Sequence, residues 1–317
     1  MFKTNNTQTL ADVLKPHTPP ESLASIASLG GINKESNDTK IGRRCDDLFA
    51  RRARRCIASK WRNDPHNCWT CIDKEYYDAY ESSLDRSLST IEEVADSIPI
   101  MDISPGTGCI TESQFQMFTG LQQVTIPSSV TCIQPRAFAD CIRLTTIHFE
   151  EGVTVIRFQT FAGCSSLKSI NLPRSVKVIS GGAFKNCIAL EEINIPERVT
   201  VIGQEAFSGC MSLKSINISQ SVNFIYDRAF ENCVALEEIN IPEGVRAIKY
   251  QTFKGCSSLN SINIPSSVNF IYNRAFEHCI ALEQIHIPKG VTMFGPHIFE
   301  GCSNLKTIDI SHGESEL

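Results

Sequence analysis

The chain has 317 residues, 42% of them hydrophobic, and a formal net charge of −5 at pH 7. This length suffices for two or three domains, and the modest charge does not indicate a nucleic-acid or membrane partner for the whole chain. There is no apolar run of about 18 residues, which a transmembrane helix would need. The first residues also lack the apolar stretch of a secretory signal. We therefore expect a cytoplasmic protein, with export by a signal-less route as the alternative.

The first third of the chain has three stretches of different composition. Residues 1–39 are rich in Thr, Asn, Ser, Pro and Lys, which predicts a disordered tail. Residues 40–62 carry nine basic and two acidic residues, a net +7, with apolar residues at helical spacing. Residues 63–96 carry two basic and nine acidic residues, a net −7. The equal and opposite charges predict that residues 40–97 form a helical segment that caps the next domain.

Two other functions are open to this N-terminal region. The basic helix over residues 40–62 is also typical of a nucleic-acid or anionic-membrane contact. Cys68 and Cys71 form a Cys-x-x-Cys pair, but the other two cysteines, Cys45 and Cys56, are spaced unlike common zinc ligands. We predict no metal ion and no cofactor, and zinc at Cys68 and Cys71 remains the alternative.

A 23-residue repeat occupies residues 98–317. Phenylalanine stands at positions 115, 138, 161, 184, 207, 230, 253, 276 and 299. A cysteine follows three positions later in every repeat but the first, a leucine six positions later, and a valine or isoleucine nine positions later. A fixed period of this size indicates a solenoid, in which stacked repeats bury one another's apolar side chains.

Each repeat can be divided into local elements. The Leu-x-x-Ile-x-Ile stretch alternates like a strand with one buried face, and a proline usually ends it. Val-x-x-Ile returns along the other side, and Ala-Phe-x-x-Cys is expected to form one helical turn. The cysteines of this column should point inward as reduced thiols, since buried Cys acts as a small hydrophobe. No fixed histidine accompanies any of them, so we predict no catalytic residue.

A 46-residue period overlies the shorter one, because Gly-Cys repeats alternate with Asn-Cys or His-Cys repeats. The residue after the leucine then mostly alternates in charge from repeat to repeat. We interpret these residues as ion pairs that set the register of the stack. They are Lys168, Glu191, Lys214, Glu237, Glu283 and Lys306, with Asn260 breaking the series.

The repeat Phe-x-x-Cys-x-x-Leu-x-x-Ile-x-Ile-Pro-x-x-Val-x-x-Ile-x-x-x-Ala resembles the BspA-type leucine-rich repeat. The stretch from Phe276 to Phe299 follows it, with Phe294 and Ile298 in place of the last Ile and Ala. The resemblance covers about two-thirds of the chain. It implies an arc-shaped repeat solenoid with a parallel sheet on its concave face and short strands or helical turns on the other side. It also implies protein binding, adhesion or host interaction in some members, and no catalytic residues shared by the family. Glycine after Val-x-x-Ile survives only at Gly203 and Gly295.

Two sets of outward-facing residues are candidate partner-binding sites. Asparagine is a poor strand former, so its recurrence on the concave face indicates either an amide ladder or a polar recognition strip. The second set is a row of aromatic residues at the turn edge, which either contacts a partner or packs on its neighbours. The polar strip comprises Asn171, Glu192, Asn194, Asn217, Glu238, Asn240, Asn263 and His286, and the aromatic edge comprises Phe224, Tyr226, Phe270 and Tyr272.

Taken together, the sequence predicts a non-enzymatic module that binds a protein, or another extended macromolecule, on its concave face. No small-molecule substrate is expected. The first alternative is a surface or exported protein that acts on another cell. The second is a nucleic-acid-bound or membrane-associated adaptor that uses residues 40–62.

Overall fold

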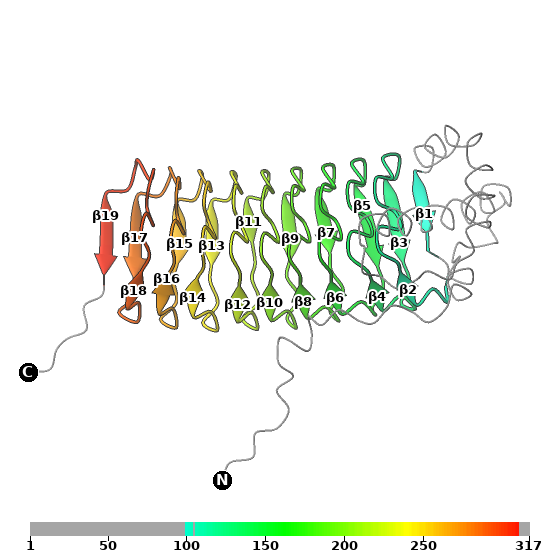
Figure 1. Ribbon diagram of the computed structural model, residues 1–317, viewed down its shortest axis with the longest axis horizontal. Coiled ribbons are helices and arrows are strands. Elements are labelled where there is room, and N and C mark those ends of the chain that lie inside the picture. The colour runs from blue at the N-terminus through cyan, green and yellow to red at the C-terminus, as the bar shows by residue number, and fades with distance from the viewer. Residues whose placement is uncertain (1–98, 104, 311–317) are drawn as a thin grey trace, which may run out of the picture.

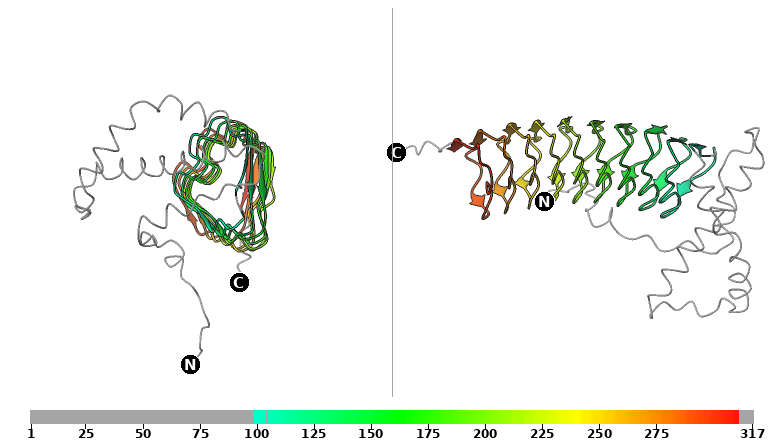
Figure 2. Two further views of the ribbon diagram at one scale, coloured as in Figure 1. Left: turned by 90° about the vertical axis from the view of Figure 1, so that its right-hand side faces the viewer. Right: turned by 90° about the horizontal axis from the view of Figure 1, so that it is seen from above.

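The computed structural model describes residues 99–103 and 105–310. Within them the chain winds into a stack of similar coils, or rungs, which follow one another along one long axis (Figure 1). Viewed along that axis, the rungs superimpose on a closed outline (Figure 2, left). The predicted repeat solenoid is therefore confirmed. The predicted tail at 1–39 and helical cap at 40–97 lie outside the described residues.

Each rung contributes one strand to each of two faces of the coil. Within a face the parallel strands hydrogen-bond in groups of two to four, and each face is called a sheet below. All strand pairs are parallel and join residues 23 positions apart, such as Asn171 with Asn194 and Val178 with Val201. The first sheet contains β1 (Ile100–Asp102), β3 (Gln123–Ile126), β5 (Thr146–Phe149), β7 (Ser169–Asn171), β9 (Glu192–Asn194), β11 (Ser215–Ile216), β13 (Glu238–Asn240), β15 (Ser261–Asn263), β17 (Gln284–Ile287) and β19 (Thr307–Ile310). The second contains β2 (Cys109–Ile110), β4 (Cys132–Ile133), β6 (Val155–Ile156), β8 (Val178–Ile179), β10 (Val201–Ile202), β12 (Phe224–Ile225), β14 (Ala247–Ile248), β16 (Phe270–Ile271) and β18 (Met293–Phe294).

The core fills the inside of the coil. It consists of columns, each formed by the side chains at one repeat position in successive rungs. The nine repeat phenylalanines stack face to face, with ring centroids 5.0–5.7 Å apart and interplanar angles of 3–17°. Leu213 and Val222, from two other columns, are fully buried. Because each side chain is covered mainly by the same position in the adjacent rungs, burial depends on stacking.

The segment predicted as one helical turn is a series of tight turns, and no described residue lies in a helix. The residues two positions before and two positions after each phenylalanine have positive φ, as Arg136 (58°) and Asp140 (59°) do around Phe138. The alternating conformation points amide groups along the stack. Phe138 N–H donates to the Thr160 carbonyl in the next rung at 2.9 Å. The left-handed residues thus replace intrahelical hydrogen bonds by bonds between rungs.

The same geometry explains the 46-residue period. From Asp140 onward, the left-handed position after the phenylalanine is filled alternately by Asn, Asp or His and by glycine, the residue types that tolerate this conformation best. A Cβ on Gly209 would overlap the amide oxygen of Asn186 in the preceding rung. The same relation holds between Gly255 and Asn232. From Asp140 onward, a side chain at this position in one rung is therefore followed by glycine in the next, which doubles the repeat.

Candidate interaction surfaces

The outward face of the first sheet carries the predicted polar strip. Asn171 pairs with Asn194, Asn194 with Asn217, and Asn240 with Asn263, each exposed and in register. Their side chains make no hydrogen bond to another residue among those described, so the amide-ladder interpretation is wrong.

The rest of the strip is also exposed, and charged pairing within it is sparse. Glu192 and Glu238 lie on the same outward face, two rungs apart. At the end of the strip, His286 Nδ1 lies 2.8 Å from a carboxylate oxygen of Asp309. The strip therefore adds two negative charges, two rungs apart, to its row of amides.

Of the predicted register-setting ion pairs, Glu283 and Lys306 form one, at 3.0 Å. In the part of the chain that the structure describes, Lys168 and Glu191 do not come within ion-pair distance, nor do Lys214 and Glu237. The in-register strands and the columns of the core hold the rungs together instead.

The aromatic edge lies on the outward face of the second sheet. Phe224 is 50% exposed and Tyr272 is 41% exposed, and Phe270 and Tyr226 are partly exposed. The rings of Phe224 and Tyr226 have centroids 6.3 Å apart, so the aromatics pack loosely on one another within a rung. Met293, paired with Phe270 and 61% exposed, extends the row toward the C-terminal end.

Cations lie over two of the neighbouring rings. Lys249 Nζ is 4.8 Å from the centroid of Tyr272, and the Arg228 guanidinium is 5.2 Å from that of Tyr250. Such cation–π contacts hold the rings in place at a solvent-exposed surface. Part of the aromatic edge is thus packed within the protein, while Phe224 keeps half of its surface open.

An apolar ridge, not predicted from the sequence, lies at the turn that precedes the first sheet. Its side chains stand four positions after the phenylalanine and are 41–51% exposed. The Cys-Ile-Ala-Leu motif of alternate rungs could have indicated this ridge. Its Ile lies between the buried Cys and Leu positions, and the core has no space for a third apolar side chain there. The ridge consists of Ile142, Ile188, Met211, Val234 and Ile280.

The repeat cysteines are free thiols, as predicted. Cys141 to Cys279 are buried, and each thiol donates to the carbonyl of the phenylalanine in the preceding rung, as Cys187 does to Phe161 at 3.2 Å. Burial raises the pKa of Cys187 to about 12. These thiols therefore remain protonated at neutral pH, and the column offers no nucleophile.

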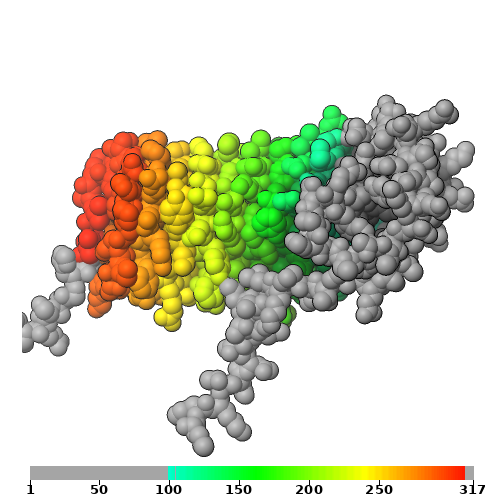
Figure 3. Space-filling model, in the orientation of Figure 1, coloured from blue at the N-terminus to red at the C-terminus, as the bar shows by residue number. Residues whose placement is uncertain are grey.

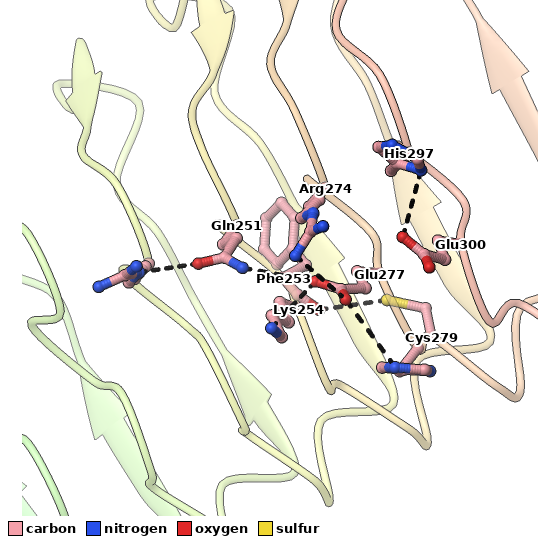
Figure 4. A network of polar contacts seen from close by, with 10 residues as sticks. Gln251, Phe253, Lys254, Arg274, Glu277, Cys279, His297 and Glu300 are labelled. Carbon is pink, nitrogen blue, oxygen red and sulfur yellow. Dashed lines mark hydrogen bonds and ion pairs between the residues drawn. The ribbon is translucent and has the colours of Figure 1, made fainter.

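A polar network lies on the third side of the rungs, along the tight turns (Figure 4). Glu277 is nearly buried and accepts from Lys254 Nζ at 3.0 Å and from the Gln251 amide at 3.4 Å. Arg228 Nε donates to the other end of Gln251 at 2.8 Å, which links three rungs. Burial raises the pKa of Glu277, but Lys254 and Gln251 outweigh it, and the pKa lies below its usual value. The polar side chains of this network bond to one another across rungs, so the network stabilises the stacking of the rungs.

The described residues contain no cluster of three or more potential metal ligands and no helix able to cross a membrane. The predicted alternatives at Cys68, Cys71 and the basic helix over 40–62 lie outside the described residues. Successive rungs form bands along the whole length of the surface in Figure 3. Long rows of repeated side chains characterise the described surface.

Comparison with known families settles the class of repeat. The sequence profile described as "BspA type Leucine rich repeat region" matches residues 108–237 and 224–316, with six copies. The chain belongs to the BspA-type leucine-rich repeat family. The family assignment agrees with the 23-residue period and with the solenoid geometry of this BspA-type protein.

Several solved leucine-rich repeat proteins are similar to this BspA-type chain. The Treponema pallidum protein TpLRR is 27% identical, with 59% of this chain and 78% of that chain covered and a TM-score of 0.45. A protein from Eubacterium ventriosum is 26% identical, with 68% and 61% covered and a TM-score of 0.49. One from Bacteroides ovatus is 25% identical, with 66% and 80% covered and a TM-score of 0.36. No curated protein matches the sequence at a significant level.

Proposed function

We propose that this BspA-type protein is a non-enzymatic scaffold that binds a protein, or another extended macromolecule, along the polar strip of its first sheet. The observation that carries the proposal is the row of exposed asparagines, Asn171 to Asn263, whose amides have no partner among the described residues. Each amide offers two donors and one acceptor. Groups fixed on rigid rungs lose little conformational entropy when they bind.

The spacing of the strip defines the partner that it suits. Neighbouring strands lie about 4.8 Å apart, so amides recur at that interval and the carboxylates of Glu192 and Glu238 at about twice it. An extended segment with polar groups at every rung and a basic group at every second rung would match both periods. This supports an extended peptide or a repetitive chain as the ligand.

The experiment compares two triple variants of the full chain as baits in an affinity pull-down. In the first, Asn194, Asn217 and Asn240 on the strip become Ser. In the matched control, three asparagines off the strip become Ser, namely Asn223, Asn269 and Asn304. We expect the strip variant to lose captured protein and the control to keep it, with the same thermal unfolding for both. Full capture by a folded strip variant would refute binding on the strip.

The aromatic edge is the second candidate surface, supported by the open faces of Phe224 and Tyr272. The variant Phe224→Ser with Phe270→Ser tests it in the same pull-down. Loss of capture in this variant, with capture retained by the strip variant, would place the partner on the second sheet.

Two alternative functions have tests of their own. Cell fractionation would find an exported protein outside the cell. Our proposal of a cytoplasmic protein predicts instead that the protein is found in the soluble fraction from inside the cell. An adaptor would bind nucleic acid or anionic vesicles in a salt-sensitive way. That binding would be lost when Arg51, Arg52, Arg54 and Arg55 become Ala.

A further inference from the structure

Two cysteines stand apart from the buried column, on the outward face of the second sheet. Cys109 in β2 and Cys132 in β4 are directly paired in adjacent parallel strands, and both are partly exposed. Strands in such a pair lie about 4.8 Å apart, within the range of roughly 4.4–6.8 Å between Cα atoms that a disulfide spans. The two thiols are therefore neighbours that a small molecule can reach.

The surroundings of the two sulfurs differ. The Gln134 amide nitrogen lies 3.0 Å from Cys132 Sγ and 3.7 Å from Cys109 Sγ, so its donor favours negative charge on Cys132. A hydrogen bond from Cys109, together with the Arg157 guanidinium and the Gln134 amide, lowers the pKa of Cys132 to about 6 despite the opposing effect of burial. The same hydrogen bond, with burial, raises the pKa of Cys109. One sulfur is thus poised as a thiolate and its neighbour as the thiol.

We propose that Cys109 and Cys132 form a thiol–disulfide exchange site whose substrate is a low-molecular-weight disulfide, with Cys132 as the attacking group and Cys109 as the resolving group. The site lies on a different sheet from the polar strip and does not depend on partner binding there. Its product is a covalent link between the first two described rungs of the second sheet.

The exchange proceeds in two balanced steps. The Cys132 thiolate attacks one sulfur of the small disulfide, a new sulfur–sulfur bond forms, and the other half leaves as a thiolate. Cys109 then loses its proton to solvent, and its sulfur attacks Cys132 and displaces the second half. Two protein thiols are oxidised to one disulfide, and one small disulfide is reduced to two small thiols after protonation.

The test uses the reduced full chain, incubated at neutral pH with glutathione disulfide and then alkylated and digested with trypsin. Residues 87–136 form a single tryptic peptide that contains Cys109 and Cys132 and no other cysteine. We expect this peptide to lose both alkylation sites and to gain an internal disulfide. The peptide of residues 186–198, which contains only buried Cys187, should remain fully reduced before denaturation.

Two variants separate the roles. C109S should stop the reaction at a glutathione adduct on Cys132, and C132S should slow adduct formation on Cys109 at least about tenfold. In the native wild-type chain, brief alkylation should label Cys132 at least about tenfold faster than Cys187. The proposal is overturned if the peptide of residues 87–136 keeps two free thiols after oxidation. It is also overturned if Cys132 reacts no faster than Cys187.

Discussion

A central rung and the last described rung have nearly the same sequence pattern but differ in burial. Leu213 is fully buried, whereas its counterpart Leu305 is only partly buried. Ile216 is 6% exposed, and Ile308, four rungs later, is 46% exposed. The central rung has neighbours on both sides, and the last has one among the described residues. The comparison shows that the pattern supplies apolar side chains and that stacking supplies their burial.

The largest expected effect comes from truncating a leucine in each rung. Leu213→Ala should reduce the free energy of unfolding by about 2–5 kcal/mol, because it leaves a cavity between two packed rungs. Leu305→Ala should cost less than half as much, since its side chain already meets solvent. Urea denaturation followed by circular dichroism measures both. Equal losses would mean that burial does not depend on the place in the stack.

A glycine pair gives the next largest difference. Gly209→Ala should cost about 1–3 kcal/mol, because φ is +76° and the new Cβ overlaps Asn186. Gly301→Ala should cost less, since Gly301 is exposed and the His278 ring beside it can move. Thermal unfolding of both variants gives the difference.

A double variant isolates the steric part of that cost. Asn186→Gly should restore part of the stability that Gly209→Ala removes, because it takes away the overlapping side chain. Purely additive losses would instead trace the whole cost to the backbone conformation.

The buried carboxylate of Glu277 should matter more than its exposed counterpart. Glu277→Ala leaves Lys254 without its partner and should cost about 1–2 kcal/mol. The same change at Glu300, whose side chain is 49% exposed, should cost little. The ordering is read from denaturation midpoints at pH 7, and a larger cost at Glu300 would contradict it.

The pH dependence of stability provides a second readout for Glu277. Its pKa is lower in the folded protein than the unfolded value of about 4.3. Its contribution is therefore complete above the unfolded value and disappears as the pH falls through the lower folded value. Glu277→Gln should flatten the loss of stability in that acidic range, compared with the wild type. If Glu277→Gln left the pH dependence of stability unchanged, Glu277 would not contribute to stability through its lowered pKa.

Substitutions on the outward face of the first sheet should change the stability little, both in a central rung and in the last described rung. Asn217→Ala and Asp309→Ala should each change the free energy of unfolding by less than about 0.5 kcal/mol, because both side chains are exposed. A cost at Asn217 as large as that at Leu213 would mean that the inward and outward faces have been exchanged.

The sequence could predict every element whose signal repeats once per rung. The Phe, Cys and Leu columns and both strands recur at 23 residues, so each position is specified up to nine times. The tight turns could not be predicted, because Arg136 and Asp140 adopt a left-handed conformation without being glycine. Helical and left-handed turns look alike when the inter-rung hydrogen bonds that select between them are unknown.

Side-chain contacts on the surface were less predictable than the backbone. The sequence leaves open whether the asparagines form an amide ladder or a recognition strip. The structure shows no ladder among the described residues, and recognition by the strip stays a proposal. The pair Cys109 and Cys132 was visible as two cysteines 23 residues apart. The proposed reactivity of this pair depends on Gln134 and Arg157. Their interactions with the sulfurs cannot be predicted from the spacing of residues in the sequence.

Amide hydrogen exchange of the full chain, followed by mass spectrometry, tests most directly whether the interior is built between rungs. The N–H groups that join one turn to the next, such as those of Phe207 and Phe276, report on each rung in turn. The account predicts the strongest protection in the central rungs and a decline toward the rung that contains Phe299. Uniform protection along all rungs, or strongest protection at the last one, would contradict it.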